Sequence, residues 1–296
     1  MKPAASQAEL ERLLEDDVPY GDLTTEALGI GEAPGIMRFE ARDPMVRALV
    51  EDAAAMIEQT GCRVELWAKS GDVLVPRAPI LTAHGEAAAL LRSWKVAQTL
   101  IEVWSGVATA ARAIVDAARA VSPDIGIACT RKNIPGTKRF AVAAVKAGGA
   151  AMHRLGLSET ILVFPEHHEF LGPVSLADVV RKLRRSAPEK RLVIEVKRMD
   201  MAIAAAMAGF DVIQAEKFSP AEIASLVAQL KTLSHVQTRR SIVAAAGGIN
   251  AENVAAYARA GADIVVTSSP YLAKPRDVQV RIAAAGAVRQ SLTEAA

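Results

Sequence analysis

The sequence is poor in aromatic residues, in cysteine and in net charge. Only 4% of its 296 residues are aromatic, and it holds two cysteines, Cys62 and Cys129. Two cysteines exclude a multi-disulfide framework and a four-thiolate zinc site. Because 35 Lys and Arg residues are balanced by 33 Asp and Glu residues, the chain lacks the basic excess typical of non-specific nucleic-acid binding. We therefore expect no nucleic-acid partner.

Long hydrophobic runs are also missing. Charged residues interrupt every apolar stretch before about 18 residues, so we expect no membrane span. The first residues lack the apolar core of about 7–15 residues that a signal peptide needs. The default location is therefore the cytoplasm, where both cysteines would remain thiols. General disorder is excluded because 51% of the residues are hydrophobic.

The pattern of the chain changes near residue 105. A length of 296 residues favours about two domains of roughly 150 residues each. Up to residue 104, short β-rich runs such as 34–42 and 80–84 are mixed with helical runs such as 47–60. A long helical run follows over 87–119, and we expect Ser105-Gly106 to interrupt it. Residues 1–104 are therefore predicted to form a first domain of mixed helices and strands.

After residue 120, β-rich runs alternate regularly with Ala-rich helical runs. The expected strands are 125–129, 151–153, 161–164, 192–196, 212–215, 242–246 and 264–267. Strands that alternate with helices form a parallel sheet with right-handed crossovers. We therefore predict an α/β barrel or an incomplete barrel over 105–275. A last helix is predicted over 278–292, within a segment, 276–296, that could return to the first domain.

Chemically active side chains follow the expected strands. In a parallel barrel, active sites lie at the carboxyl ends of the strands. Those ends carry Thr130, Arg131 and Lys132, then His153 and Arg154, Phe164 and Glu166, Glu195 and Lys197, Glu216 and Lys217, Gly247 and Gly248, and finally Ser268 and Ser269. The early ends are cationic and the middle ends carry carboxylates. This pattern favours a small polyanionic substrate, because Arg and Lys bind phosphates and carboxylates.

Three of these features suggest specific ligands. Glu195 and Glu216 could hold a ribose by its hydroxyls, or a Mg²⁺ ion that bridges phosphates. Gly247 and Gly248 precede a helical run that we expect to begin near residue 250, and their backbone N–H groups could bind a phosphate. The charge of Glu195 is the most informative single feature, because a carboxylate directly after an apolar strand needs a reason.

Simpler interpretations remain for several of these residues. Arg131-Lys132 could be a solvated turn, and so could His153-Arg154. His167 and His168 are disfavoured as a metal pair, because adjacent residues on a strand point in opposite directions. Cys129 beside Arg131 could be a reactive thiolate, although a packed thiol is favoured. The coincidence of so many groups at one end of the sheet favours a functional site.

The motifs resemble those of a known enzyme family. Thr130-Arg131-Lys132 with Pro135-Gly136, followed by Gly148-Gly149 and by His153-Arg154-Leu155-Gly156-Leu157, is similar to the signature of quinolinate phosphoribosyltransferases, also called nicotinate-nucleotide pyrophosphorylases. The runs 20–24, 70–73, 105–109 and 247–249 match further family segments, so the resemblance covers nearly the whole chain. Within the family, the runs 130–138 and 161–167 resemble a branch associated with molybdate uptake.

The resemblance implies a fold, a reaction and a set of roles. The fold is an α/β sandwich domain followed by an open, incomplete α/β barrel, built as a homodimer with a shared active site; a higher oligomer is also compatible. The reaction uses 5-phosphoribosyl 1-pyrophosphate and Mg²⁺. Glu195, Glu216 and Lys132 would be catalytic, with the two glutamates near the ribose or Mg²⁺. The residues that would bind substrate are Lys95 (from the partner subunit), Arg131, Lys132, His153, Arg154, Phe164, Gly247, Gly248, Ser268 and Ser269.

Departures from the family pattern gather at the acceptor end of the expected site. Phe164 stands where the family has a lysine that meets the substrate, and Lys95 stands for an arginine. Further differences are Cys129 for Asp or Glu, Ala246 for serine, Ser268 for glycine and Lys217 for asparagine. We therefore expect a phosphoribosyl transfer to an acceptor other than quinolinate. The alternatives are an authentic quinolinate enzyme and a non-catalytic protein that binds an oxyanion or a nucleotide.

Overall fold

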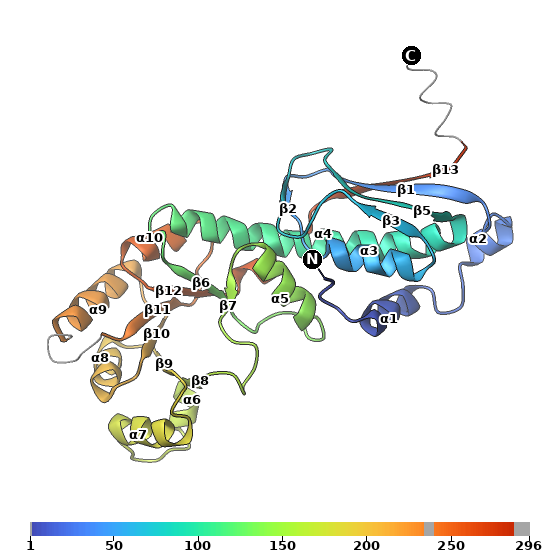
Figure 1. Cartoon of the computed structure of the whole chain (residues 1–296). Helices are drawn as coiled ribbons and strands as arrows, with labels where there is room; N and C mark the ends of the chain where they lie inside the picture. The colour runs from blue at the N-terminus through green and yellow to red at the C-terminus, as the bar shows by residue number, and fades with distance from the viewer. Residues whose placement is uncertain (1, 234–239, 287–296) are drawn as a thin grey trace. The chain divides into compact units, whose positions relative to one another are not determined.

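The computed structural model describes residues 2–233 and 240–286 (Figure 1). The chain divides into two compact units, and neither is a single stretch of sequence. The first comprises Met1–Ala110, Ile134–Gly149 and Leu272–Ala296, and the second comprises Ala111–Asn133 and Ala150–Tyr271. Residues 134–149 fall within the predicted second domain, 105–275, but belong to the first unit. They contain the whole of helix α5 (Lys138–Ala147).

The first unit is an antiparallel sheet covered by helices. Its strand order is β13-β1-β5-β3, with bounds Val278–Ala284, Pro34–Ala41, Pro79–Glu86 and Arg63–Leu66. Helix α3 (Val50–Gln59) and the first part of α4 (Ala87–Arg119) lie against one face of this sheet (Figure 1). Met37, Phe39 and Ala41 alternate with less buried residues along β1, as expected for a strand with one face in the core. This arrangement confirms the predicted α/β sandwich.

Smaller elements complete the first unit. Helix α1 spans Gln7–Asp17, helix α2 spans Leu23–Leu28, and strands β2 (Met45–Val46) and β4 (Val73–Leu74) form a separate two-stranded sheet. Ser6 caps α1, since its hydroxyl accepts from the Glu9 N–H while the Glu9 carboxylate accepts from the Ser6 N–H. Such a reciprocal pair satisfies two N–H groups at the start of a helix.

The predicted helix over 278–292 is wrong where the structure describes it. Val278–Ala284 forms strand β13, which pairs antiparallel with β1 from Val278↔Ala41 to Ala284↔Gly35. The residues Val278, Val280 and Ile282 carry the period of two that a strand needs, and the edge of the sheet supplies partners for their backbone groups. The rest of the predicted helix, from residue 287, lies outside the described residues.

The predicted interruption at Ser105-Gly106 is also wrong. Helix α4 continues for 33 residues from Ala87 to Arg119. Gly106 serves a close approach and not a break, because a Cβ there would lie 2.3 Å from the carbonyl oxygen of Lys274. Glycine costs a helix about 1 kcal/mol relative to alanine, so a long, well-packed helix tolerates it. No helix in the described part of the chain combines the length and the apolar character of a membrane span.

The second unit is a curled parallel sheet that leaves a barrel open. Its strand order is β7-β6-β12-β11-β10-β9-β8. The bounds, in chain order from β6 to β12, are Gly126–Cys129, Ala151–Met152, Ile161–Val163, Leu192–Val196, Val212–Glu216, Ile242–Ala246 and Ile264–Thr267. Since β7 and β8 each pair with a single neighbour among the described strands, the sheet does not close there. The predicted incomplete α/β barrel is therefore confirmed.

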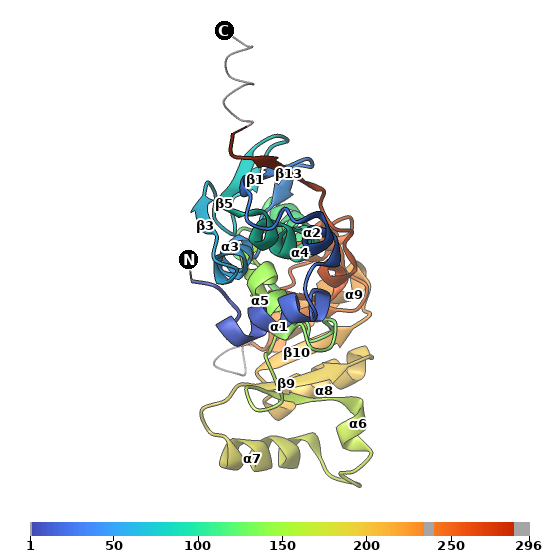
Figure 2. The same cartoon turned by 90° about the vertical axis from the view of Figure 1, so that its right-hand side faces the viewer.

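Helices pack on the outside of this sheet. Helices α8 (Met199–Ala208) and α9 (Pro220–Leu233) contact strands β9, β10 and β11 (Figures 1 and 2). Helix α7 (Leu176–Ser186) packs against α8, and α10 (Val254–Arg259) follows β11. The sequence of α8 is almost uniformly apolar, with buried Ala202, Ala205 and Ala206, so small side chains allow it to pack closely on the strands.

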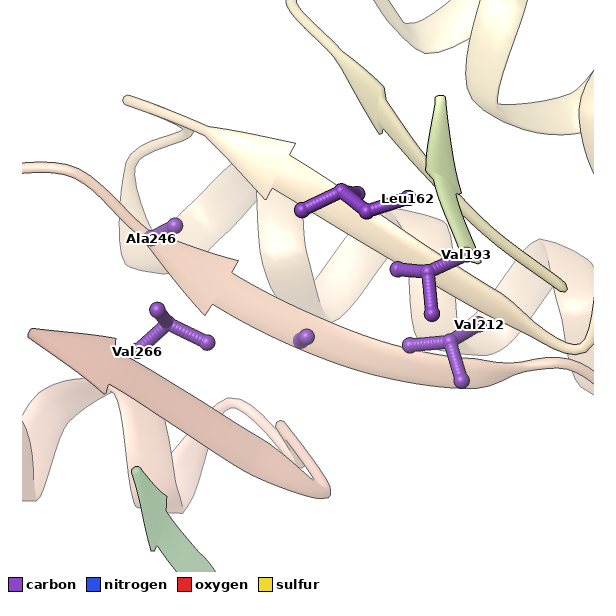
Figure 3. Packing of buried hydrophobic residues seen from close by; sticks show 6 residues of the cluster. Leu162, Val193, Val212, Ala246 and Val266 are labelled. Carbon is purple, nitrogen blue, oxygen red and sulfur yellow. The ribbon is translucent and has the colours of Figure 1, made fainter. Parts of the chain in front are cut away.

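The inner face of the curled sheet holds an apolar cluster that supports the site. Its members lie on strands β8 to β12 and are Leu162, Val193, Val212, Ala244, Ala246 and Val266. Figure 3 shows the packing of this cluster. Because side chains alternate between the faces of a strand, the residues two positions beyond Val193 and Val212 point to the same side. Those residues are Glu195 and Gln214, so the inner face changes from apolar to polar toward the carboxyl ends of the strands.

Candidate active site

A cavity of about 570 Å³ lies at the carboxyl ends of the parallel strands. Its lining consists of Thr130, Arg131, Lys132, His153, Arg154, Leu162, Phe164, Glu166, Glu195, Gln214, Glu216, Lys217, Ala246, Gly247, Gly248, Val266, Thr267 and Ser268. Ten of the residues predicted from the sequence to bind or act on substrate belong to this lining. They are Arg131, Lys132, His153, Arg154, Phe164, Glu195, Glu216, Gly247, Gly248 and Ser268.

Two predicted site residues are not in this lining. Ser269 begins a 3₁₀ turn, Ser269–Leu272, and its N–H donates to Thr267 Oγ1 at 3.0 Å. Lys95 belongs to the first unit, on α4, where its Nζ donates to Gln98 Oε1 at 3.0 Å and lies 3.9 Å from the centre of the Trp94 ring. The predicted role of Lys95 in a partner's active site stays a prediction.

The order of strands in the sheet separates the charges of the cavity. Arg131, Lys132 and Arg154 follow β6 and β7 at one end of the strand order, while the three carboxylates end or follow β10, β9 and β8 at the other, where Lys217 is the cation beside them. Gly247 and Ser268 lie between them, after β11 and β12. Among the described residues, no salt bridge joins a cation of the lining to one of its carboxylates. Both sets of charges are therefore available to a ligand.

Arg154 is the most buried cation of the cavity. Its exposure is 6%, and its guanidinium carbon lies 5.4 Å from the centre of the Phe164 ring. Burial, followed by the charge of Arg131, lowers the pKa of Arg154. Burial, followed by the charge of Arg154, lowers the pKa of His153. Its imidazole is therefore mostly neutral at pH 7. A buried guanidinium without a carboxylate is costly and favours an anionic ligand.

Glu195 is the carboxylate whose surroundings perturb it most clearly. Burial raises its pKa, and the charges of Glu216 and Glu166 raise it further, while a hydrogen bond from Gln214 lowers it. That bond runs from Gln214 Nε2 to Glu195 Oε2 at 2.7 Å. The two residues are direct neighbours in the parallel register of β9 and β10. Three carboxylates thus share one end of the cavity and repel each other electrostatically.

Sequence reasoning missed Gln214. This residue is 4% exposed and lines the cavity. The signal was present, because Gln214 lies on the predicted strand 212–215, two residues before Glu216, and residues two apart share a face where the strand continues. A polar residue in the middle of a buried strand needs a hydrogen-bond partner, and Glu195 provides one.

The diglycine loop after β11 has backbone geometry that requires glycine. Gly247 and Gly248 adopt φ values of 92° and 73°. A Cβ on Gly247 would lie 2.8 Å from Lys217 Cγ and 2.9 Å from Glu216 Oε1, whereas a Cβ on Gly248 would meet nothing within 4 Å. The helix expected to begin near residue 250 begins only at Val254. The loop therefore offers its own backbone to a ligand, without a helix directly behind it.

Phe164 was predicted as the last residue of strand 161–164, but strand β8 ends at Val163. The two histidines that follow lie on a helix and not on a strand. Pro165–His168 forms the short helix α6. The Phe164 N–H donates to His167 Nδ1 at 2.9 Å, and the two rings stack with centres 5.9 Å apart. His167 thus holds Phe164 in place. Within the described residues, no group of three His, Cys, Asp or Glu side chains is arranged to hold a metal ion.

Cys129 is a structural thiol. It is fully buried at the end of β6, and burial raises its pKa to about 12. A thiol with so high a pKa is not a nucleophile near neutral pH. The favoured interpretation of Cys129 as a packed thiol is therefore confirmed, and the reactive thiolate is wrong.

Comparisons with known proteins agree with this architecture of a curled parallel sheet with a charged cavity at its strand ends. The family model described as "Quinolinate phosphoribosyl transferase, C-terminal domain" matches residues 107–281, and the corresponding N-terminal domain matches 22–105. The chain belongs to the quinolinate phosphoribosyl transferase family. The resemblance predicted from its motifs is confirmed, and the protein is a phosphoribosyl transferase enzyme.

Individual proteins of known sequence or structure are similar to this chain over most of its length. A protein of Rhodobacter capsulatus is 44% identical over 252 residues, covering 85% of this chain and 95% of the relative. One of Escherichia coli O157:H7 is 36% identical over 284 residues, covering 96% and 99%. Both are named "Putative pyrophosphorylase ModD". The nicotinate-nucleotide pyrophosphorylase of Francisella tularensis superposes with a TM-score of 0.85 at 20% identity, covering 96% of this chain and 100% of that one. At that identity it shows a shared fold.

Proposed function

We propose that this protein transfers the phosphoribosyl group of 5-phosphoribosyl 1-pyrophosphate to an acceptor other than quinolinate. The separation of charge within one cavity carries the proposal. Arg131, Lys132 and Arg154 follow the strands at one end of the strand order, and Glu195 and Glu216 lie at the other, with Lys217 beside them. A substrate that develops positive charge on a sugar and negative charge on a leaving group matches both ends.

The proposed reaction breaks one bond and forms another. The bond between ribose C1 and the pyrophosphate oxygen breaks, and pyrophosphate leaves with the electron pair. A lone pair on the acceptor forms the new bond to C1. Positive charge develops on the ribose, where Glu195 and Glu216 would stabilise it, and negative charge develops on pyrophosphate, which the cations would stabilise. The N–H groups of Gly247 and Gly248 would bind the 5′-phosphate.

The donor set also supports a role for Mg²⁺. Glu195 and Glu216 are hard oxygen donors of the kind that Mg²⁺ prefers, and Mg²⁺ commonly binds through one or two carboxylates together with substrate phosphates. Since the described residues hold no complete metal site, we propose that the ion enters with the pyrophosphate of the substrate. When bound, it would neutralise charge on that leaving group.

Phe164 supports an acceptor other than quinolinate. Its family counterpart is a lysine that meets the substrate, and quinolinate carries two carboxylates. Replacing an ammonium group by a ring removes one charge partner from the cavity. The Phe164 ring instead stacks on His167 and faces the guanidinium of Arg154. The acceptor end is thereby less cationic and more apolar than the family motif implies.

Phe164→Lys tests whether Phe164 prevents the use of quinolinate as the acceptor. We expect the wild-type protein to form no nicotinate mononucleotide from quinolinate, phosphoribosyl pyrophosphate and Mg²⁺, and we expect Phe164→Lys to gain measurable turnover. Chromatographic detection of the product and of released CO₂ would measure both. Met207→Lys, which adds the same charge at an exposed site on α8 outside the cavity, is the control. Ordinary rates of quinolinate decarboxylation by the wild type would overturn the proposed acceptor.

Gly247→Ala tests the phosphate loop. The new Cβ meets Lys217 and Glu216 at less than 3 Å, on a backbone with φ of 92°. Strain of about 1–3 kcal/mol predicts a rise of roughly 5- to 150-fold in the Kd for phosphoribosyl pyrophosphate, measured by calorimetry. Gly248→Ala is the matched control, because its Cβ meets nothing within 4 Å, and we expect a smaller effect. Equal effects would show that the clash at Gly247 is unimportant.

The competing function is a protein that binds an oxyanion without catalysis. Glu195 and Glu216 favour the enzyme, because an oxyanion gains nothing from carboxylates beside it. Calorimetry with phosphoribosyl pyrophosphate and Mg²⁺, compared with molybdate, separates the two. Tight binding of molybdate alone would favour the binder and would connect the chain to molybdate uptake, a link that rests on motif resemblance.

We further propose a cytoplasmic homodimer in which Lys95 completes the partner's cavity. The exposed position of Lys95 on α4 and its correspondence to a family arginine support this role. The cysteines Cys62 and Cys129 are free thiols, as expected in a reducing compartment. Sedimentation equilibrium tests the dimer, and a strictly monomeric protein with full activity would contradict it.

A further inference from the structure

A second cavity adjoins the charged one on the outer side of β8. It has a volume of about 820 Å³, and four residues line both cavities: Arg131, Arg154, Leu162 and Phe164. We propose that this side cavity, which rests on the phosphoribosyl transfer proposed above, binds the acceptor substrate, and that the acceptor is an apolar ring compound with an anionic group.

The open edge of the sheet creates the side cavity. Strand β8 is the last strand of the curled sheet and pairs only with β9 among the described strands. The short helix α6 and the segment after it lead away from this edge to α7, and the space between β8 and α7 remains unfilled. The contact of Arg154 with the Phe164 ring, at 5.4 Å, joins the ends of β7 and β8 and forms the shared wall.

Most of the lining of the side cavity is apolar, although Asp178 and Lys182 of α7 also belong to it. Leu157, Val163, Phe170, Leu171, Val174 and Leu183 contribute to it. Three of these side chains are unusually accessible, with exposures of 74% for Leu157, 92% for Phe170 and 45% for Val174. Large apolar side chains that surround one hollow gain free energy when a ligand covers them. A volume between about 300 and 1,000 Å³ is typical of sites for ring-bearing small molecules.

Positive charge at one end of the side cavity defines the polar part of the ligand. Arg131 and Arg154 form the end that faces the charged cavity. An anionic group placed there would satisfy the buried guanidinium of Arg154, and the nucleophilic atom would point toward the ribose site. Phe164, which replaces a family lysine, offers its ring to the apolar part of the ligand. The substitution thus exchanges a charge contact for an aromatic surface between the two cavities.

The probe 8-anilinonaphthalene-1-sulfonate tests the proposal, because it joins an apolar ring system to an anion and fluoresces when it binds apolar surface. We expect one probe to bind per chain, and to bind together with phosphoribosyl pyrophosphate and Mg²⁺. Leu157→Glu and Phe170→Glu should each raise the probe's Kd at least about tenfold, since a carboxylate would enter the apolar lining and repel the sulfonate. Both residues are exposed, so folding is preserved.

Met207→Glu is the matched control, since Met207 is 64% exposed on α8 and lines neither cavity. It should leave the Kd of the probe within about twofold. Displacement of the probe by phosphoribosyl pyrophosphate, or unchanged binding in Leu157→Glu and Phe170→Glu, would overturn the proposal. So would probe binding confined to dilute, dissociated protein, because a second copy of the chain would then fill the cavity.

Calorimetry with phosphoribosyl pyrophosphate on the same variants keeps the two proposals separate. Leu157→Glu and Phe170→Glu should bind it like the wild type, because neither residue lines the charged cavity. If the wild type fails to bind it, the proposed function is wrong, and the assignment of an acceptor is lost with it. Probe binding then still decides whether the side cavity takes apolar anions.

Discussion

Glu195→Gln lowers the rate of pyrophosphate release from phosphoribosyl pyrophosphate by about 10²- to 10³-fold, the loss typical of one preorganised charge at a reacting centre. The substitution keeps the shape of the side chain and its hydrogen bond from Gln214 Nε2, now at 2.7 Å. It removes the negative charge that opposes the developing charge on the ribose. Without Mg²⁺, the Kd for phosphoribosyl pyrophosphate should change little, because the ground state carries no such charge and Glu195 then holds no ion. A coupled pyrophosphate assay, with water as the acceptor, measures the rate.

Glu166→Gln is the control for this prediction. Glu166 lines the same cavity and carries the same charge, but it is exposed on α6 and not on a strand. Its loss should lower the rate far less. Equal losses in the two variants would show that the net charge of the cavity matters and the position of Glu195 does not.

The pH dependence of the wild-type rate gives a second readout of Glu195. Burial, with help from Glu216 and Glu166, raises its pKa above the usual value of 4.5. Since the ionised carboxylate is the active form, the rate falls as the pH is lowered through this raised pKa. The acid limb of the profile therefore lies at higher pH than an ordinary glutamate would give. In Glu195→Gln that limb should disappear, and an unchanged limb would assign it to another group.

Arg154→Met should raise the Kd for phosphoribosyl pyrophosphate by roughly 10- to 100-fold, since hydrogen bonds to charged groups contribute about 1.5–3 kcal/mol. The residue is 6% exposed, and its guanidinium has no carboxylate partner among the described residues. A ligand anion would therefore be its main partner. Isothermal titration calorimetry measures the change.

The thermal stability of Arg154→Met distinguishes a binding role from a structural one. Replacing a buried, uncompensated charge by an apolar side chain of similar length is neutral or stabilising, so we expect the Tm to stay or to rise. Arg198→Met is the control, because Arg198 is exposed and paired with Asp200 outside the cavity. A large fall in Tm for Arg154→Met would show that the guanidinium holds the fold together.

Much of the site was predictable because its residues are local to strand ends. A run such as Leu192–Val196 has the composition of a buried strand, and the charged residue at its end has few structural explanations. Periodicity and turn residues therefore placed Arg131, His153, Glu195, Glu216 and Gly247 at one edge of a sheet. Gln214 was missed because a single polar residue inside an apolar run looks unremarkable until its cross-strand neighbour is known.

Other elements depended on contacts that are distant in sequence. Val278–Ala284 is a strand because the edge of β1 supplies hydrogen-bond partners, and its local sequence is compatible with a helix. Gly106 remains inside α4 because the backbone at Lys274 approaches it. In both cases a segment far along the chain overrode a local preference, which amounts to about 1 kcal/mol or less per residue.

The sequence by itself determined the class of fold, the family and the chemical groups at the strand ends, because periodicity and motifs are properties of neighbouring residues. Only the tertiary structure decided how those groups are arranged. The order β7-β6-β12-β11-β10-β9-β8 places Arg131 and Arg154 after the strands at one end and Glu195 and Glu216 on the strands toward the other. The unfilled edge beside β8 then opens an apolar cavity next to Phe164. Strand order and edge packing depend on burial summed over the whole unit, and no local pattern encodes that sum.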